Sequence, residues 1–348
     1  MIKGMNPRER FFSAIRREKP DRVPISLWTH AYNNFSGASF REYARDGEKM
    51  AKAHLAFLHD FSVDFLKVTP CGLFFAEDWG GKLEYIEEKA SVRCLEYPVK
   101  STEDWEKLEV LDPRKARLHL EQLKCLRRIG EAVGKATPFL ETIFNPLTTA
   151  AKIAGDQKVL SDMKKNPSAL RKGLQTITDS LADFAKACLN EGASGIFYSI
   201  KSCSGDVISP SDFSTFSKPY DMQLISSMKG ADVIMLHAHN DKEGANLLVN
   251  NLMDYPVHAI NWWDKGATPN LEEAKASFHK KFCLVAGLDH VRTFLKNPID
   301  VQNEIIAAMK SAPADGGFIL GPGCVLPPNT PRQNLSAALS AASEHGKY

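Results

Sequence analysis

The stretch VIMLHAHND, residues 233–241, places two of the chain's ten histidines two positions apart, where an apolar run meets polar residues. Such a short apolar run is consistent with a buried strand. Residues i and i+2 of a strand point to the same side, so His237 and His239 can direct two imidazoles into one space. Imidazole is the commonest protein ligand of metal ions. The spacing therefore indicates part of a metal site.

A third ligand is available in the stretch GPGCVLPP, residues 321–328, where glycine and proline form a turn that leaves room around Cys324. Two imidazoles and one thiolate would leave the fourth tetrahedral position of a zinc ion open, which is typical of catalytic zinc. A His-x-His pair can equally be a hydrogen-bonded polar cluster without metal, and a cysteine in such a turn can be there because it is small. Spacing alone leaves both interpretations open.

The elements that must position these residues alternate along the chain. Eight short apolar or β-branched runs are separated by segments with helical periodicity. The runs are VPISLW (23–28), FLKVTP (65–70), FLETIF (139–144), GIFYSI (195–200), VIMLHA (233–238), VHAINW (257–262), FCLVAG (282–287) and GFILG (317–321). This alternation predicts an α/β protein in which residues 1–348 form a single (β/α)8 TIM-barrel domain. An open doubly wound sheet is the alternative, although no G-x-G-x-x-G follows the first run to support a dinucleotide-binding version of it.

Capping residues mark the predicted helices. Asn6 and Glu9 form a capping-box pattern at the start of the first helix. Residues 166–192 have a long amphipathic pattern that ends at a glycine. Segments 209–230 and 330–346 begin with Ser or Thr followed by Pro and end at glycine, which predicts one helix in each.

Active sites of such barrels lie where the strands pass into the following loops. Besides the three possible ligands, Asn145 and Asp264 stand at these positions. Asp264 could accept a hydrogen bond from the second nitrogen of a metal-bound imidazole. Asn145 could orient a substrate, or it could close the turn before a helix that begins at Pro146. Further residues at predicted strand ends are Trp28, His30, Thr69, Cys71, Lys201, Ser202, Cys203, Asn261, Trp263, Asp289 and His290.

The composition favours a small-molecule partner. The 44 Lys and Arg residues nearly balance the 42 Asp and Glu residues, and no basic stripe or polybasic cluster indicates nucleic-acid or membrane binding. The seven cysteines are scattered, without a Cys-x-x-Cys pair, which is typical of a reducing compartment. The charged N-terminal segment lacks the apolar core of a signal peptide, and no apolar run reaches about 18 residues. We therefore expect a cytoplasmic protein that binds neither nucleic acid nor membrane.

Four segments, taken in order, cover nearly the whole chain: NPRERFFSAIRREKPDRVPISLW, SPSDFSTFSKPYDMQLI, NWWDKGATPNLEEAK with the later LVAGLD, and GPGCVLPPNTPRQNLSAALSAASEHGKY. Together they resemble the uroporphyrinogen decarboxylase superfamily. The resemblance implies a (β/α)8 barrel. It implies one of two activities, because the superfamily contains the uroporphyrinogen decarboxylases of haem synthesis and zinc-dependent methyltransferases. The latter move a methyl group from a methylated corrinoid protein to a thiol such as coenzyme M.

The chain departs from the decarboxylase branch. Those enzymes are similar to one another around an RQAGR segment that grips the substrate carboxylates, whereas this chain reads THAYNNFSGAS there, with no arginine until Arg41. A polyanionic porphyrinogen would lose its bidentate partners. The resemblance offers Asp64, in SVDFLKV, as the counterpart of the decarboxylases' central aspartate. Their C-terminal histidine is replaced by Cys324.

The methyltransferase branch binds zinc through His-x-Cys at the fifth strand end and a cysteine in the GPGC loop. His237 and Cys324 match this pattern, and His239 stands where the first cysteine is expected. Exchanging a thiolate for a neutral imidazole would raise the charge of the zinc site by one unit. A thiol held there would become more acidic, and its thiolate less nucleophilic.

The sequence therefore predicts a zinc-dependent methyltransferase that moves a methyl group between a methylated corrinoid, or another methyl donor, and a thiol. The expected zinc ligands are His237, His239 and Cys324, and the expected catalytic residues are Asp64, Asn145 and Asp264. Because the chain ends with the last expected barrel helix, a corrinoid protein would be a separate partner, and the resemblance also allows a homodimer. The alternatives are a metal-free decarboxylase that acts on a smaller carboxylated substrate through Asp64, and a non-catalytic binding protein.

Overall fold

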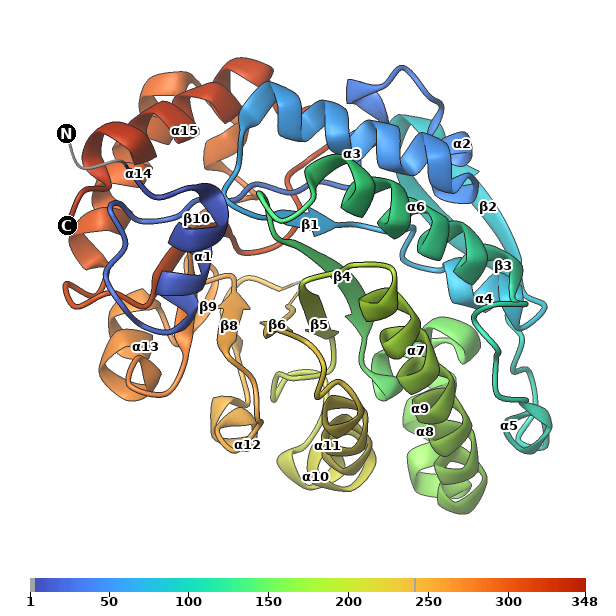
Figure 1. The fold of residues 1–348 in the computed structure, drawn as a ribbon. Helices are drawn as coiled ribbons and strands as arrows, with labels where there is room; N and C mark the ends of the chain where they lie inside the picture. The colour runs from blue at the N-terminus through green and yellow to red at the C-terminus, as the bar shows by residue number, and fades with distance from the viewer. Residues whose placement is uncertain (1–3, 241) are drawn as a thin grey trace.

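The computed structural model describes residues 4–240 and 242–348. Within these residues seven strands form one curled parallel sheet, in the order β1-β4-β5-β6-β8-β10-β11 (Figure 1). The strands are β1 (Leu66–Val68), β4 (Phe139–Phe144), β5 (Gly195–Ile200), β6 (Val233–Ala238), β8 (Ala259–Trp262), β10 (Cys283–Leu288) and β11 (Phe318–Pro322). Since all seven strands are parallel, their carboxyl ends lie along one edge of the sheet.

Seven of the eight apolar runs coincide with these strands, which confirms an α/β fold built on a parallel sheet. The first run, residues 23–28, differs from the prediction because it makes isolated bridges, with Ile25 paired to Leu320, instead of a regular strand. Pro24 has no N–H to donate, so a continuous ladder cannot form on both sides of this segment. The described residues thus form a curled sheet of seven parallel strands, and the closed eight-stranded barrel stays a prediction.

Helices alternate with the strands and pack on the outer face of the sheet (Figure 1). They are α1 (Pro7–Ile15), α2 (Phe40–Arg45), α3 (Gly47–Phe61), α4 (Phe74–Asp78), α5 (Asp104–Lys107), α6 (Arg117–Val133), α7 (Pro146–Ala154), α8 (Asp156–Lys165), α9 (Pro167–Asn190), α10 (Pro210–Phe216), α11 (Lys218–Ser227), α12 (Val249–Leu252), α13 (Leu271–Phe278), α14 (Pro298–Ser311) and α15 (Arg332–His345). The predicted capping box is present at α1, where Asn6 and Glu9 satisfy each other's backbone N–H groups. The long amphipathic pattern forms α9, and the C-terminal pattern forms α15.

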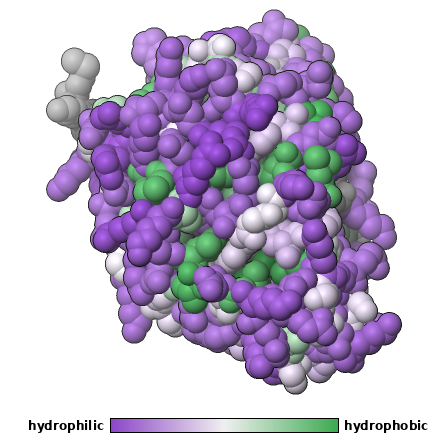
Figure 2. Space-filling view, turned by 90° about the vertical axis from the view of Figure 1, so that its right-hand side faces the viewer, coloured by the Kyte–Doolittle hydropathy of each residue, from purple (hydrophilic) through white to green (hydrophobic). Residues whose placement is uncertain are grey.

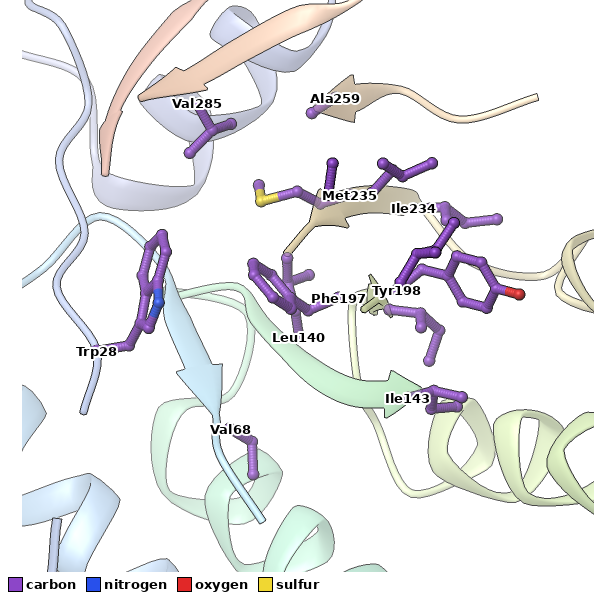
Figure 3. Packing of buried hydrophobic residues seen from close by; sticks show 14 of the residues in the cluster. Trp28, Val68, Leu140, Ile143, Phe197, Tyr198, Ile234, Met235, Ala259 and Val285 are labelled. Carbon is purple, nitrogen blue, oxygen red and sulfur yellow. The ribbon is translucent and has the colours of Figure 1, made fainter. Parts of the chain in front are cut away.

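Alternation along the strands separates the inside of the curled sheet from the helix layer. Figure 3 shows Trp28, Leu140 and Phe197 turned toward one another inside, whereas Tyr198 and Ile234 point away from them. The rings of Trp28 and Phe197 lie 5.6 Å apart in an edge-to-face arrangement. Residues two positions further along these strands face the same inner side. They lie nearer the carboxyl ends of the strands, where the polar residues are.

The prediction of one helix over residues 209–230 was wrong. The segment divides at Ser217 into α10 and α11. Pro219 lies in the first turn of α11, where a missing N–H is tolerated, but in a continuous helix it would remove a hydrogen bond and clash with the carbonyl of Thr215. The break lets the Ser217 hydroxyl donate to Asp221 at 2.8 Å.

Two small pairs of strands were not predicted. An antiparallel hairpin joins β2 (Lys82–Ile86) to β3 (Ser91–Glu96), and a short parallel pair joins β7 (Ala245–Asn246) to β9 (Ala267–Thr268). The hairpin strands are exposed or half-buried along their whole length, so they lack the apolar run that reveals a core strand.

The surface in Figure 2 is mostly hydrophilic, and its hydrophobic residues gather in small separate groups. Within the described part of the chain, no helix combines the length and the apolar character that a membrane span requires.

Candidate metal centre

His237, His239 and Cys324 come together at the carboxyl ends of the strands. His237 is the next-to-last residue of β6, His239 follows that strand, and Cys324 lies in the loop after β11. Their possible ligand atoms all lie within 4.8 Å of one another, and Cys324 Sγ is 3.4 Å from Nδ1 of His239. The convergence predicted from the sequence is therefore present in the structure.

Asn261 on β8 orients His237. The Asn261 amide nitrogen donates to the carbonyl oxygens of Val285 at 2.8 Å and Pro322 at 3.1 Å. Its amide oxygen is therefore the atom that accepts the 2.7 Å hydrogen bond from Nδ1 of His237. This arrangement protonates Nδ1 and leaves Nε2 of His237 as the metal-binding nitrogen.

The glycines of the GPGC loop bring Cys324 close to the sheet. A Cβ atom on Gly323 would lie 2.5 Å from the Cα of Trp263, and one on Gly321 would lie 2.9 Å from the Trp28 ring. No real side chain fits at the first of these distances, so the loop can pack against β8 only with glycine at position 323. This close approach is what carries the Cys324 thiol to the two imidazoles.

The surroundings of the three residues favour the protonation states that zinc binds. Burial opposes ionisation of Cys324, but the neighbouring His239 and His237 outweigh it and hold the pKa of the thiol well below its ordinary value. Burial also lowers the pKa of His237, which keeps this imidazole neutral. A thiolate and a neutral imidazole are the forms in which cysteine and histidine bind metal ions. The donor set and its protonation therefore fit zinc.

A cavity of about 260 Å³ lies beside the three residues. Lys67, Lys152 and Lys201 line it together with the aromatic rings of Trp28 and Phe197, and none of the described lining residues carries a carboxylate. Burial lowers the pKa of Lys67 to about 8, against the influence of Cys324, so its ammonium is still the main form at neutral pH. The cavity is suited to a small anionic molecule.

Asp264 does not have the position predicted for it. Its carboxylate accepts a hydrogen bond from the backbone N–H of Gly287 at 3.0 Å and lies 3.3 Å from the ammonium of Lys265. The acceptor for His237 is Asn261, because these two residues face each other across the β6–β8 pairing. Asp264 therefore joins β8 to β10 next to the site instead of orienting the ligand histidine.

Asp64 lies at the opposite end of the sheet, immediately before β1, where the strands begin. Its fully buried carboxylate pairs with Arg10 at 2.6 Å and Arg22 at 2.8 Å, and it accepts the N–H of Ile25 at 2.8 Å. The structure thus places the Asp64 carboxylate in a cluster with two arginines and not among the residues that line the cavity.

Asn145 has the structural role that was weighed for it. Its side-chain oxygen accepts the N–H of Thr148 and so caps α7, while its amide nitrogen donates to Ser217 and to Asp221, both at 2.9 Å. Asp221 is fully buried and also accepts from Tyr198. Asn145 therefore holds α7, which carries two residues of the cavity wall, and does not itself line the cavity.

Two features of the site are not predicted from the sequence. Asn261 stands at a predicted strand end, but its role as the partner of His237 follows only from the structure. Lys67 stands inside the apolar run FLKVTP and is not among the predicted site residues. Its inward orientation follows from alternation with Thr69, which also lines the cavity.

Comparison with known proteins gives the same picture. Methylcobamide:CoM methyltransferase MtbA of Methanosarcina acetivorans is 26% identical to this chain over 98% of both proteins. A uroporphyrinogen decarboxylase of Myxococcus xanthus is 23% identical over 97% of both. A solved structure, a methyltransferase from Methanosarcina mazei, has the same fold, with a TM-score of 0.86 at 21% identity and coverage of 98% of this chain and 99% of that one.

The family model described as Uroporphyrinogen decarboxylase (URO-D) matches residues 6–345. The resemblance seen in the sequence is thereby confirmed, including its closer relation to the methyltransferase branch. Since the match covers nearly the whole chain, this protein belongs to the uroporphyrinogen decarboxylase family.

Proposed function

We propose that this protein is a zinc-dependent methyltransferase that moves a methyl group between a methylated corrinoid, or another methyl donor, and a thiol acceptor. The convergence of His237, His239 and Cys324 beside a cavity is the observation that carries the proposal. The similarity to methylcobamide:CoM methyltransferases supports it. A corrinoid protein, as a separate partner, would deliver the methyl group to the mouth of this cavity.

His237, His239 and Cys324 would hold the zinc ion, which would supply Lewis-acid stabilisation of the acceptor as a thiolate at neutral pH. Three protein ligands leave one tetrahedral position for the acceptor. Asn261 keeps the His237 ring in the required tautomer and orientation through its fixed amide. The apolar walls around Trp28 and Phe197 limit water around the acceptor sulfur.

The reaction balances without a further reactant. With a methylated corrinoid as donor, the carbon–cobalt bond breaks and its electron pair stays on cobalt. A carbon–sulfur bond forms on the acceptor, and the thiol proton is released. The protein contributes the position and the ionisation state of the sulfur, while the cobalt chemistry belongs to the donor.

The decarboxylase alternative is not favoured by the structure. Its only assigned acid, Asp64, is paired with two arginines at the amino ends of the strands. The described part of the cavity wall has no carboxylate that could protonate a pyrrole carbon or hold a pyrrole N–H.

We also propose that residues 23–29 complete the sheet as an eighth strand-like segment, so that residues 1–348 form a single barrel domain. Leu320 on β11 donates to Pro24 at 2.8 Å, and Ser26 donates back to Leu320 at 3.0 Å. On the other side, Asp64 donates to Ile25 at 2.9 Å. These backbone hydrogen bonds, to β11 on one side and to the segment before β1 on the other, support the proposal.

The proposal is tested by metal analysis and by a transfer assay. Purified protein should retain about one zinc per chain after exhaustive dialysis, because three converging ligands form a high-affinity site. With methylcobalamin and a thiol under anaerobic conditions, mass spectrometry should detect the methylated thiol, and Cys324→Ser should lose both zinc and transfer. Absence of stoichiometric zinc together with transfer that survives Cys324→Ser would refute the proposal.

A further inference from the structure

We propose that Arg292 is a positioning residue of the candidate metal centre. Its guanidinium joins the loops that follow β6, β8 and β10, and so holds the loop of His239 in place beside the loop of Cys324. The proposal rests on the proposed function for the identity of the metal, and on the contacts of Arg292 for the positioning. Arg292 is not one of the described residues that line the cavity, and it acts through the loops that carry the ligands.

Asp289, the first residue after β10, fixes Arg292 within its own loop. The Asp289 side chain is buried, and its Oδ1 accepts the backbone N–H of Val291 at 3.0 Å and that of Arg292 at 3.3 Å. Its Oδ2 accepts the Nε–H of Arg292 at 2.5 Å. Because the same carboxylate binds the backbone and the side chain of Arg292, the guanidinium has a defined orientation.

The two terminal nitrogens of Arg292 reach two other loops. Nη1 donates to the carboxylate of Glu243 at 2.7 Å, in the loop that follows β6 and carries His239. Nη2 donates to the backbone carbonyl of Lys265 at 3.3 Å, in the loop that follows β8. A guanidinium presents five N–H donors in a rigid plane, so one arginine can bind acceptors from three segments at once.

Trp263 connects Arg292 with the loop of Cys324. The central carbon of the guanidinium lies 5.9 Å from the centre of the Trp263 ring, within the range of a cation–π contact. The indole is buried, and Gly323 packs against the backbone and Cβ of Trp263 so closely that no side chain fits there. A continuous series of contacts therefore runs from the guanidinium through Trp263 to the residue before Cys324.

The main-chain connection between the loops after β6 and β8 is short. β7 and β9 pair over two residues each, and the Gly244 N–H donates to the Gly266 carbonyl at 2.8 Å. Two-stranded pairs are at best marginally stable by themselves. The side-chain contacts of Arg292 therefore supplement a weak main-chain connection.

His239 depends on this connection more than His237 does. His237 lies within β6 and is oriented by Asn261, whereas His239 lies outside the strand. The His239 N–H donates to the Ile200 carbonyl at 2.9 Å, which holds the residue on the side of β5. On its other side the chain continues into the loop that Arg292 holds through Glu243. Since a binding site needs its groups within about 0.5 Å of the productive geometry, loosening this loop should weaken metal binding.

The test measures the loop and the metal separately in Arg292→Met, which keeps an unbranched side chain but removes the guanidinium. In metal-free protein, hydrogen exchange of the Gly244 amide should become roughly fivefold faster or more, because local opening of the loop is easier. Zinc affinity, measured by competition with a chelator, should fall roughly tenfold, as for other groups that position metal ligands. Circular dichroism and a melting curve show whether the variant is folded.

Two further variants at positions with the same chemistry serve as comparisons. Arg292→Lys should restore only part of both properties, because one ammonium cannot reproduce the planar set of donors. Arg128→Met is the matched control, since Arg128 on α6 is similarly exposed and also binds two carboxylates, those of Glu48 and Glu131. It should leave Gly244 exchange and zinc affinity at the values of the parent.

Substitutions of Glu243 test the same contact from the other loop. Glu243→Gln keeps an oxygen acceptor and should stay close to the parent, whereas Glu243→Ala should reproduce part of the effect of Arg292→Met. The double variant of Glu243→Ala and Arg292→Met should add little to Arg292→Met alone, since the two residues share one interaction.

The inference is overturned if Arg292→Met exchanges the Gly244 amide as slowly as the parent, or if exchange becomes faster while zinc affinity is unchanged. A parent protein that binds no zinc would refute the proposed function. Faster Gly244 exchange in metal-free Arg292→Met would in that case support the connection of the loops by Arg292, and unchanged exchange would overturn it.

Discussion

Asn261 connects the sheet register with the chemistry of His237. The two residues are partners across the β6–β8 pairing, and the Asn261 amide is fixed by two carbonyl acceptors. Removal of a group that orients a ligand histidine typically weakens metal binding by about 10- to 100-fold. We expect a loss of this size in zinc affinity for Asn261→Ala, measured by competition with a chelator.

Asp264→Asn is the matched control, because Asp264 lies near the site but is engaged by Gly287 and Lys265. Its zinc affinity should stay within a few fold of the parent. Equal losses in the two variants would mean that both side chains act on the metal ligands, contrary to the hydrogen bonds described above.

His239 provides a second test at the level of single residues. If His239 binds zinc at the position where the family resemblance predicts a cysteine, His239→Cys should keep the metal, since tetrahedral zinc accepts sulfur at about 2.3 Å as well as nitrogen at about 2.0–2.1 Å. His239→Ala should weaken zinc binding sharply. With a second protein thiolate, an acceptor thiol would be less acidic and more nucleophilic, so the pH–rate profile for methyl transfer should move upward.

Zinc content and chelator competition measure the first two outcomes for His239 independently of activity. Zinc binding by His239→Ala as tight as that of the parent would show that His239 faces substrate or solvent instead of the metal. Cys324→Ala is the comparison variant, because Cys324 Sγ lies next to His239 and should be needed by any metal held there.

The three metal-binding candidates could be found from the sequence because each depends on a local rule. Two histidines at i and i+2 of a strand must share a side, and a Gly-Pro-Gly turn must give its cysteine room. The partner of His237 could not be found in this way. Which of Asn261 and Asp264 faces the imidazole depends on the register between β6 and β8, and register is set by packing across the whole sheet.

At the level of elements, a buried side chain of α3 holds the carboxyl end of β1 in place. His54 on α3 is fully buried, its Nδ1 donates to the Met50 carbonyl at 2.9 Å and its Nε2 accepts from the Thr69 N–H. Burial lowers the pKa of His54 from 6.5 to about 3, so the folded protein holds this ring neutral.

This pKa predicts a loss of stability in mild acid. Because the folded-state pKa is depressed, the unfolded chain binds the extra proton first, and the contribution of His54 is fully present above its unfolded pKa and is lost as pH falls toward the folded one. At pH 5 the loss from this group alone is about 2 kcal/mol. Urea unfolding at pH 7.5 and pH 5 should show that His54→Gln costs less stability at pH 5 than at pH 7.5.

His59→Gln is the control for this experiment, since His59 lies on the same helix with an exposed side chain. It should lose nearly the same stability between the two pH values as the parent, because an exposed ion pair, such as that of His59 with Asp60 at 3.2 Å, contributes little. If the stability of His54→Gln also changes with pH as much as that of the parent, His54 is not the group that titrates. Its hydrogen bond with the Thr69 N–H then does not make stability depend on pH.

Most elements of the sheet could be located from the sequence because a buried parallel strand requires a continuous apolar run. The same rule fails where no run exists, as in the β2–β3 hairpin, whose residues are exposed or half-buried. It also fails at residues 23–28, where the run is apolar but Pro24 interrupts the ladder. The break between α10 and α11 is caused by Pro219. Proline breaks a helix in its interior but is tolerated in a first turn, and the sequence alone does not say in which turn Pro219 lies.

For the whole molecule, the site charge and the cavity size together limit the substrate. The candidate ligands would give zinc two neutral imidazoles and one thiolate, so the metal centre would keep a positive charge. The described cavity wall adds lysines and no carboxylate. Both features favour a small anionic acceptor, and neither provides the acid that a decarboxylase would need.

We predict that this protein does not decarboxylate uroporphyrinogen at a useful rate. The substrate is a ring of four pyrroles with several acetate and propionate groups, whereas the cavity of about 260 Å³ lies below the range of roughly 300–1,000 Å³ that ligand pockets usually have. Residues 29–40 contain no arginine that could form bidentate pairs with the substrate carboxylates. Asp64 is paired with Arg10 and Arg22 at the other end of the sheet. Anaerobic incubation with authentic substrate, followed by chromatography, should therefore yield no decarboxylated porphyrinogen, while a true decarboxylase assayed in parallel should yield it. Turnover on the order of 1 per second or more would mean that the cavity opens well beyond the structure described here and that the lysines replace the missing arginines.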